Sequence, residues 1–250
     1  MPSSASPISI NWNKEFARVI SCKHCTSSTD RALLRDEAEN VPQPGYVGKH
    51  YFKSRVILIG QNPGTPKTLG LKDQPYTAAL RALRDLPNAT NYRTLSKVLE
   101  DFIPQWPVQA RHFPLHECGL TLNDIAYFNL VRCRTIEDRA PSKKLSDACV
   151  SQHFDRWVQV MQPRVVIFIG KWASDRAATR LEEVGVPSAY VNRLRNLTLT
   201  ERAMNRKAVV DRPWSTWFGR TSQCACLETR DGDGNILGGE ESEQESGEKK

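Results

Sequence analysis

The sequence predicts an α/β protein of three layers, α/β/α, with a central four-stranded, mainly parallel sheet between helices. Short aliphatic runs, typical of strands buried on both faces, alternate with segments whose apolar residues follow the helical period. A chain of 250 residues is also long enough for one domain with a well-buried core. We assign residues 1–230 to this domain and residues 231–250 to an acidic, glycine-rich tail that we expect to be disordered.

The predicted elements alternate along the chain as this fold requires. Apolar runs, two of them rich in valine and isoleucine, predict strands over residues 56–60, 126–131, 164–169 and 188–191. Apolar residues at helical spacing, or runs of good helix formers, predict helices over residues 10–19, 30–38, 76–86, 91–102, 145–161, 172–184 and 200–207. Prolines and glycines between residues 41 and 48 predict a loop.

The first strand ends in a tight turn, Gly60-Gln61-Asn62-Pro63-Gly64. Open α/β sheets bind their ligands at the carboxyl ends of the strands, so this turn is the first place to expect chemistry. The two glycines let the backbone approach a ligand, and the proline stiffens the turn. Two carboxamides can read the edge of a nucleobase or hold a water molecule, but they supply no nucleophile.

Charge and composition narrow the class of protein. The net charge is +7, yet the last twenty residues alone carry seven acidic and two basic side chains, so residues 1–230 carry about +12. This excess predicts a polyanionic partner such as DNA. The absence of a long apolar run and of a signal peptide predicts a cytoplasmic protein without membrane contact, and the absence of a glycine-rich nucleotide loop argues against a nucleotide cofactor. We also expect a monomer.

Three segments resemble the uracil-DNA glycosylase superfamily, in the right order over roughly residues 20 to 175. The turn 60–64 is similar to the G-x-N-P-G turn of its mismatch-specific, thymine and single-strand-selective glycosylases. Residues 129–134, Asn-Leu-Val-Arg-Cys-Arg, look like the N-V-V-K-C-R segment of its iron-sulfur branch, and residues 163–170 are similar to that branch's P-K-V-I-V-x-L-G strand. The iron-sulfur branch itself carries G-E-A-P-G, so this chain combines two signatures.

The cysteines agree with the iron-sulfur branch. Seven cysteines in a cytoplasmic chain favour metal binding or catalysis over disulfides. Cys22, Cys25, Cys133 and Cys149 are arranged like the four-cysteine ligand set of the iron-sulfur uracil glycosylases, which implies a [4Fe-4S] cluster. Spacing alone also allows a tetrahedral zinc ion, or four buried thiols without a ligand.

The resemblance also implies roles for residues at the strand ends. Asn62, with Gln61 beside it, would position the water that attacks the sugar, and Asn129 would read the edge of a pyrimidine. Tyr76 lies near the position of an aromatic residue that stacks on the flipped base, with Gly60 and Gly64 lining the base pocket. A core role for Tyr76 and a strand-capping role for Asn129 are the alternatives.

In two other segments of the pocket, the sequence departs from the pattern of the iron-sulfur branch. Lys67-Thr68 stands where the iron-sulfur branch has an E-D pair, and the final H-P-S-type loop, whose histidine stabilises the leaving base, is not recognisable. Asn192 or Arg193 is nearest to that histidine. Lys67, Asn192, Arg193, Leu194 and Arg195 are the predicted DNA contacts, with Leu194 a candidate wedge and the two arginines candidate phosphate ligands.

These observations predict a DNA glycosylase that flips out a pyrimidine nucleotide and hydrolyses its N-glycosidic bond. Uracil is the substrate that the resemblance implies, and the departures point equally to a 5-substituted or hypermodified base. The corresponding roles are DNA repair and defence against phage with modified DNA. The alternatives are a catalytically inactive DNA-binding module on the same fold and a zinc-stabilised scaffold protein.

Overall fold

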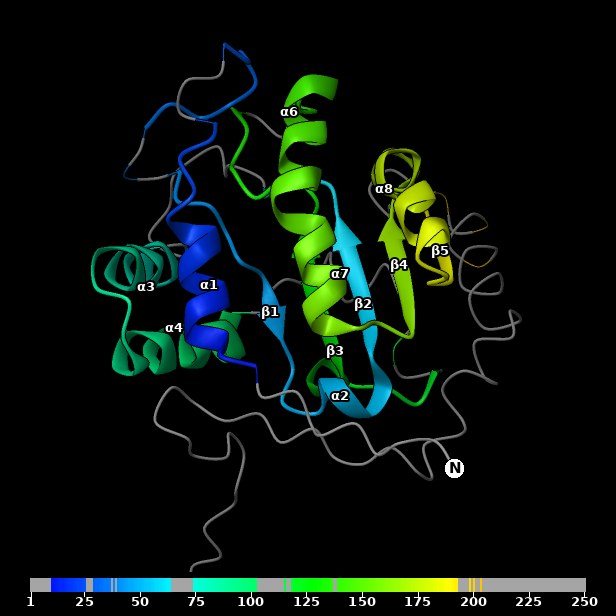
Figure 1. The fold of residues 1–250 in the computed structure, drawn as a ribbon, viewed down its shortest axis with the longest axis horizontal. Helices are drawn as coiled ribbons and strands as arrows, with labels where there is room; N and C mark the ends of the chain where they lie inside the picture. The colour runs from blue at the N-terminus through cyan, green and yellow to red at the C-terminus, as the bar shows by residue number, and fades with distance from the viewer. Residues whose placement is uncertain are drawn as a thin grey trace, which may run out of the picture.

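A computed structural model describes residues 10–25, 29–36, 38, 40–63, 74–102, 115, 118–136, 139–192, 198, 200 and 203. In this part of the chain, helices lie against one five-stranded sheet of order β1-β3-β2-β4-β5 (Figure 1). The strands are β1 (Tyr46–Val47), β2 (Val56–Gly60), β3 (Ile125–Asn129), β4 (Val165–Ile169) and β5 (Ser188–Val191). Strands β2 to β5 are parallel to one another, and β1 is antiparallel to β3.

The predicted fold class is confirmed, with one more strand than expected. The four predicted strands correspond to β2 to β5 within one or two residues at each end. The addition is β1, two residues within the segment 41–48 that we predicted to be a loop. A strand this short has no periodic pattern, and it forms because Tyr46 and Val47 pair with Tyr127 and Ala126 at the edge of the sheet.

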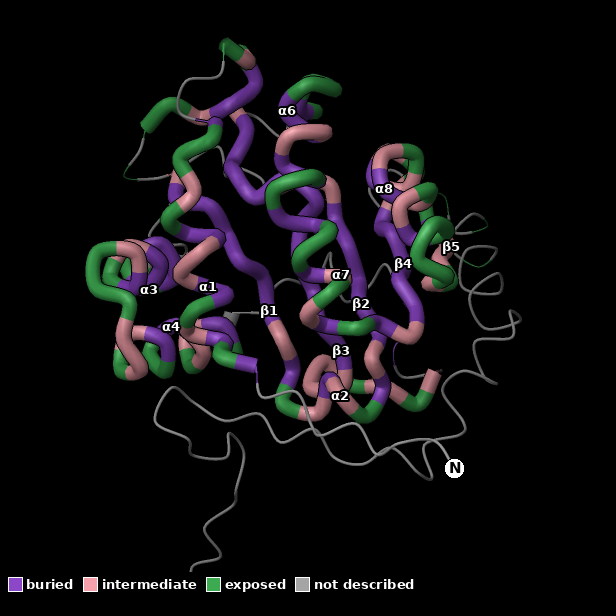
Figure 2. Tube along the Cα trace, viewed as in Figure 1, coloured by how far each residue is buried: buried purple, intermediate pink, exposed green. Residues whose placement is uncertain are grey.

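Every residue of β2, β3 and β4 is buried, so both faces of the central sheet are covered (Figure 2). This burial explains why these strands are continuous apolar runs rather than alternating ones. Because β2, β3, β4 and β5 run in the same direction, their carboxyl ends meet at one edge of the sheet. The turn after β2 and Asn129 at the end of β3 therefore lie side by side.

The helices occupy most of the predicted segments. In chain order they are α1 (Trp12–Ile20), α2 (Tyr51–Ser54), α3 (Gln74–Asp85), α4 (Ala89–Phe102), α6 (Lys143–Cys149), α7 (Asp155–Met161) and α8 (Lys171–Glu183). The short α2 and a 3₁₀ turn at Leu122–Asp124 were not predicted, because neither is long enough to show a period. The predicted helix 200–207 lies almost wholly outside the described residues. Within the described residues, no helix is both long and apolar enough to cross a membrane.

The prediction of a helix over residues 30–38 is wrong for the described part of that segment. Residues 30–36 and 38 form turns and one isolated bridge, between Leu33 and Thr135. The cause is local: the carboxylate of Asp30 accepts from the backbone N–H of Ala32 at 2.9 Å, and that of Asp36 accepts from Ala38 at the same distance. Aspartates that bond to the backbone two residues on favour turns over helix.

Residues 145–161 were predicted as one helix, and the structure interrupts it with a π-helical stretch, Val150–Phe154, between α6 and α7. Cys149 before it and Trp157 after it are both buried. The helical period alone could not show this, because an added residue in a turn resembles an imperfect amphipathic pattern.

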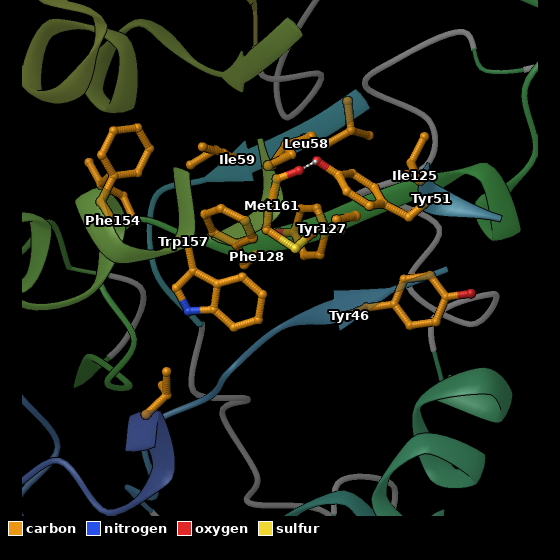
Figure 3. Packing of buried hydrophobic residues seen from close by; sticks show 14 of the residues in the cluster. Tyr46, Tyr51, Leu58, Ile59, Ile125, Tyr127, Phe128, Phe154, Trp157 and Met161 are labelled. Atoms are coloured by element: carbon orange, nitrogen blue, oxygen red, sulfur yellow. Dashed lines mark hydrogen bonds between the residues drawn. The ribbon is translucent and has the colours of Figure 1, made fainter. Parts of the chain in front are cut away.

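The main core lies between the sheet and the helices α1 and α7 (Figure 3). Trp157 of α7 stacks on Trp12 of α1 with ring centroids 6.0 Å apart and lies 5.6 Å from the ring of Phe128 in β3. The hydroxyl of Tyr51 donates to the carbonyl of Met161 at 3.2 Å, which ties α2 to the end of α7. These contacts hold α1, and hence the cysteine loop that follows it, against the sheet.

Candidate active site and cysteine cluster

Gly60 and Asn129 lie opposite each other in the last pair of the parallel ladder between β2 and β3. A methyl group on Gly60 would collide with the Asn129 Oδ1 and lie 2.7 Å from the Tyr127 hydroxyl. The Tyr127 hydroxyl donates to Asn129 Oδ1 at 3.2 Å. Glycine is therefore needed at the strand end because a polar pair from β3 occupies the space over it.

The backbone after β3 runs alongside the turn after β2 and holds that turn in place by hydrogen bonds. The N–H of Leu130 donates to the Gly60 carbonyl at 2.8 Å, and the N–H of Val131 donates to the Gln61 carbonyl at 2.9 Å. Further along, the N–H of Thr135 reaches the Pro63 carbonyl at 3.4 Å. Two segments that are far apart in the sequence thus form one rigid edge, which holds Gln61 and Asn62 at the surface beside Asn129.

The Asn62 carboxamide has a defined orientation. Its Nδ2 donates to the Thr135 Oγ1 at 2.6 Å and to the Pro63 carbonyl at 3.1 Å. Both bonds use the nitrogen, so the oxygen Oδ1 takes part in neither. A half-buried amide held in this way keeps a hydrogen-bond acceptor two residues beyond Gly60, which pairs with the base-reading candidate Asn129.

The other predicted pocket residues are placed as follows. Tyr76 lies in α3 with only 1% of its surface exposed, inside the main core, so stacking on a base stays a prediction that requires one ring face to be uncovered. Asn192 follows β5 and is exposed at the same edge of the sheet as Asn129. The described residues do not include Gly64, Lys67, Arg193, Leu194 and Arg195.

The four predicted ligand cysteines come from three segments that meet beside this edge. Cys25 and Cys133 form a hydrogen bond between their thiols, and both line a cavity of about 600 Å³ together with Cys22. Cys149, at the end of α6, is buried in a small cluster with Cys25 and Cys133, and its Sγ accepts from the backbone N–H of Arg132 at 3.4 Å. All four are free thiols, not disulfides.

The protonation of these thiols depends on their burial and on each other. Burial raises the pKa of Cys22, and it raises the pKa of Cys149 to about 12. The hydrogen bond between Cys25 and Cys133 lowers the pKa of the first thiol and raises the pKa of the second. Among the described residues, no three Cys, His, Asp or Glu side chains are grouped closely enough to hold a single metal ion.

Sequence reasoning missed two residues beside these sites, Thr135 and Arg132. Arg132 is 1% exposed, with its guanidinium 4.3 Å from the ring centre of Phe128 and its Nη1 donating to the Pro44 carbonyl at 2.8 Å. Burial lowers its pKa to about 10. Arg132 lies within the motif that we compared with the iron-sulfur branch, so its position next to Cys133 was the available signal. Thr135 had no such signal.

The comparison with protein families decides the identity of the fold. The model of the uracil DNA glycosylase superfamily matches residues 48–214, about two thirds of the chain. The chain belongs to the uracil DNA glycosylase superfamily. Among curated proteins, no sequence matches this chain.

Membership of this superfamily confirms the resemblance at the level of the whole family. It supports a DNA glycosylase, a hydrolase of the bond between a base and its sugar, with DNA as the partner. The matched region begins before β2 and extends past β5, so it contains Asn62, Asn129, Cys133 and Cys149. Cys22 and Cys25 precede it.

Proposed function

We propose that this superfamily member is a monofunctional DNA glycosylase that flips a pyrimidine nucleotide from DNA and hydrolyses its N-glycosidic bond, leaving an abasic site. The observation that carries the proposal is the pair of oriented carboxamides, Asn62 and Asn129, at the adjoining carboxyl ends of β2 and β3. An acceptor for water and a reader of the base are thus fixed side by side, in a family that acts on DNA.

In the proposed reaction, the Asn62 Oδ1 accepts a hydrogen bond from a water molecule and directs its oxygen toward the anomeric carbon of the sugar. The bond between carbon and base breaks with its electron pair remaining on the base, and the bond to the water oxygen forms. A neutral carboxamide does not retain a proton, so the proton of the water passes to the departing base or to solvent. Asn62 contributes placement rather than base strength, which predicts slow turnover.

Asn129 is suited to recognise the pyrimidine. Its Oδ1 accepts from the Tyr127 hydroxyl, so the amide nitrogen Nδ2 is the group that can donate to a carbonyl oxygen of the base. Such a donor stabilises the negative charge that develops on the carbonyl oxygens as the base departs. The Tyr127 bond, in a buried position, holds this donor in place before the substrate arrives.

The substrate that we propose is uracil or a bulkier 5-substituted pyrimidine, including a hypermodified base of a viral genome. Removal of uracil would serve DNA repair, and removal of a modified base would serve defence against foreign DNA. The G-x-N-P-G turn and the altered final loop support the bulkier base, and the iron-sulfur signature supports uracil.

The experiment measures free base by mass spectrometry after incubation with oligonucleotides that contain uracil or 5-substituted pyrimidines. We expect release from at least one substrate, and loss of release in Asn62→Ala with unchanged DNA affinity. Gln159→Ala, an exposed position on α7, is the matched control and should release base at the unmodified rate. Binding without release across the whole panel would instead favour the inactive DNA-binding module.

We also propose that Cys22, Cys25, Cys133 and Cys149 hold a [4Fe-4S] cluster. The support is the donor set: four thiols from three segments converge, and three of them line one cavity. Four thiolates can hold either a cluster or a tetrahedral zinc ion, and the resemblance to the iron-sulfur branch favours the cluster. The cluster would be structural, since it would join the loop after α1 to the loop after β3 and to α6.

A further inference from the structure

The acceptor for the Asn62 amide is supplied by Thr135, a residue with no assigned role. The distance of 2.6 Å between Asn62 Nδ2 and Thr135 Oγ1 makes this the shorter of the two bonds that the amide donates. Thr135 is completely buried, with 0% of its surface exposed. Its hydroxyl is therefore shielded from solvent.

The backbone around Thr135 is held on both sides. Its own N–H reaches the Pro63 carbonyl, and it forms an antiparallel bridge with Leu33. Around that bridge, the N–H of Leu34 donates to the Arg134 carbonyl at 3.1 Å, and the N–H of Ile136 donates to the Ala32 carbonyl at 2.8 Å. Thr135 thus lies between the turn after β2 and the segment after the first cysteine pair, with little freedom to move.

An asparagine amide has two orientations that exchange its oxygen and nitrogen, and only one of them presents an acceptor to water. The Pro63 carbonyl can accept but not donate, so it selects the orientation with Nδ2 inward. The Thr135 hydroxyl provides a second acceptor on the same side. A hydroxyl can also donate, so the Pro63 carbonyl sets which way round the amide lies, and the Thr135 bond anchors the amide there with Oδ1 outside both bonds.

We propose that Thr135 is a positioning residue for Asn62, which holds the carboxamide in the orientation that presents Oδ1 to the hydrolytic water. This inference rests on the proposed role of Asn62. Correct orientation of a reacting group before the substrate binds is worth one or more orders of magnitude in rate. The bridge to Leu33, which packs with Cys25 and Cys133, extends this support to the cysteine cluster.

The test compares Thr135→Val, which keeps the shape but removes the hydroxyl, with Thr135→Ser, which keeps the hydroxyl. Single-turnover base release from the best oligonucleotide should fall about 10- to 100-fold in Thr135→Val. DNA affinity should change by less than about twofold, and Thr135→Ser should restore most of the rate. When Asn62→Ala is already present, adding Thr135→Val should reduce the residual release no further, because the two residues act as a unit.

A second measurement does not depend on activity. The side-chain amide signals of Asn62 in a ¹⁵N NMR spectrum, identified by their absence in Asn62→Ala, should shift and exchange faster with water in Thr135→Val and recover in Thr135→Ser. Unchanged amide signals, or an unmodified release rate in Thr135→Val when Asn62→Ala is inactive, would overturn the inference. Release that survives Asn62→Ala would refute the proposed function of Asn62 itself, which is a different result.

Discussion

A methyl group at Gly60 tests the packing of the site at the scale of one residue. In Gly60→Ala the new carbon meets the Asn129 Oδ1 and the Tyr127 hydroxyl, and one of these side chains must move. We expect base release to fall at least about tenfold and stability to fall by about 1–3 kcal/mol, the usual cost of overpacking. Single-turnover release and urea denaturation measure the two effects.

The control for this substitution is Gly185→Ala, where the backbone has a φ of +69° and nothing lies near the added carbon. That variant costs backbone strain, about 1 kcal/mol, without touching the site. It should unfold more easily and release base at the unmodified rate. If both variants lose activity in proportion to stability, the contact between Gly60 and Asn129 has no specific role.

Individual residues also show what the sequence could predict about the site. Asn62 and Asn129 were found through their motifs. Asn62 lies in the turn after the first strand, where open α/β sheets bind ligands, and Asn129 lies in the segment that resembles the iron-sulfur branch. Thr135 and Arg132 were not, because the hydrogen-bond partners that place them, the Asn62 amide and the Pro44 carbonyl, lie far away in the sequence. Contacts of this kind leave no periodic pattern along the chain.

At the scale of elements, the cysteine loops allow a direct test of the cofactor. Cys149→Ser removes one proposed ligand from the end of α6 with little change in volume. We expect the protein to lose most of its iron and its broad absorbance near about 400 nm, which arises from iron–sulfur charge transfer, and to unfold at a lower temperature. Iron and sulfide content, absorbance and thermal unfolding of anaerobically purified protein measure these changes.

Cys118→Ser is the matched control, because Cys118 is a free, half-buried thiol that lies outside the proposed ligand set. It should keep the iron and absorbance of the unmodified protein. Equal iron in both variants would exclude Cys149 as a ligand, and a colourless unmodified protein that contains zinc would replace the cluster by a zinc site.

Among the elements, strands were predicted more reliably than the segments between them. The strands β2 and β4 are buried on both faces, and such burial requires an unbroken apolar run that is visible in the sequence. The segment 30–38 lacked an equivalent constraint: its good helix formers were overruled by aspartates that bond to the backbone and by pairing with residues 134–136. The π-helical stretch 150–154 likewise had no signal in the sequence, and a long-range bond joins it to another element: Arg18 of α1 donates to the Gln152 carbonyl at 3.1 Å.

At the scale of the whole molecule, the buried side chain of His153 makes the free energy of unfolding depend on pH. Burial, followed by the charges of Arg132, Arg18 and His24, lowers the pKa of His153 to about 3. The folded state therefore keeps the histidine neutral, while the unfolded chain binds a proton below its ordinary pKa of about 6.5. This contribution to stability is complete above about pH 6.5, and between there and pH 3 it falls by about 1.4 kcal/mol per pH unit.

Urea denaturation at several values between pH 7.5 and 4.5 measures this slope. His153→Leu should flatten the dependence by about one proton, whereas Gln159→Ala, which replaces an exposed side chain that does not titrate, should keep the slope of the unmodified protein. An identical slope in His153→Leu would show that other groups cause the acid sensitivity.

The strand order also determines when the active site can form during synthesis. The central strand β2 has β3 and β4 as its neighbours, and both follow it in the chain: Val56 pairs with Ile125 and with Val165. A ribosome adds on the order of 5–20 residues per second, so β2 waits several seconds for its first long partner. During that interval an apolar strand has no edge to join, and the turn that carries Asn62 lacks Thr135. Folding is therefore dominated by non-local pairing, which is slow, and the nascent chain is exposed to aggregation until β3 emerges.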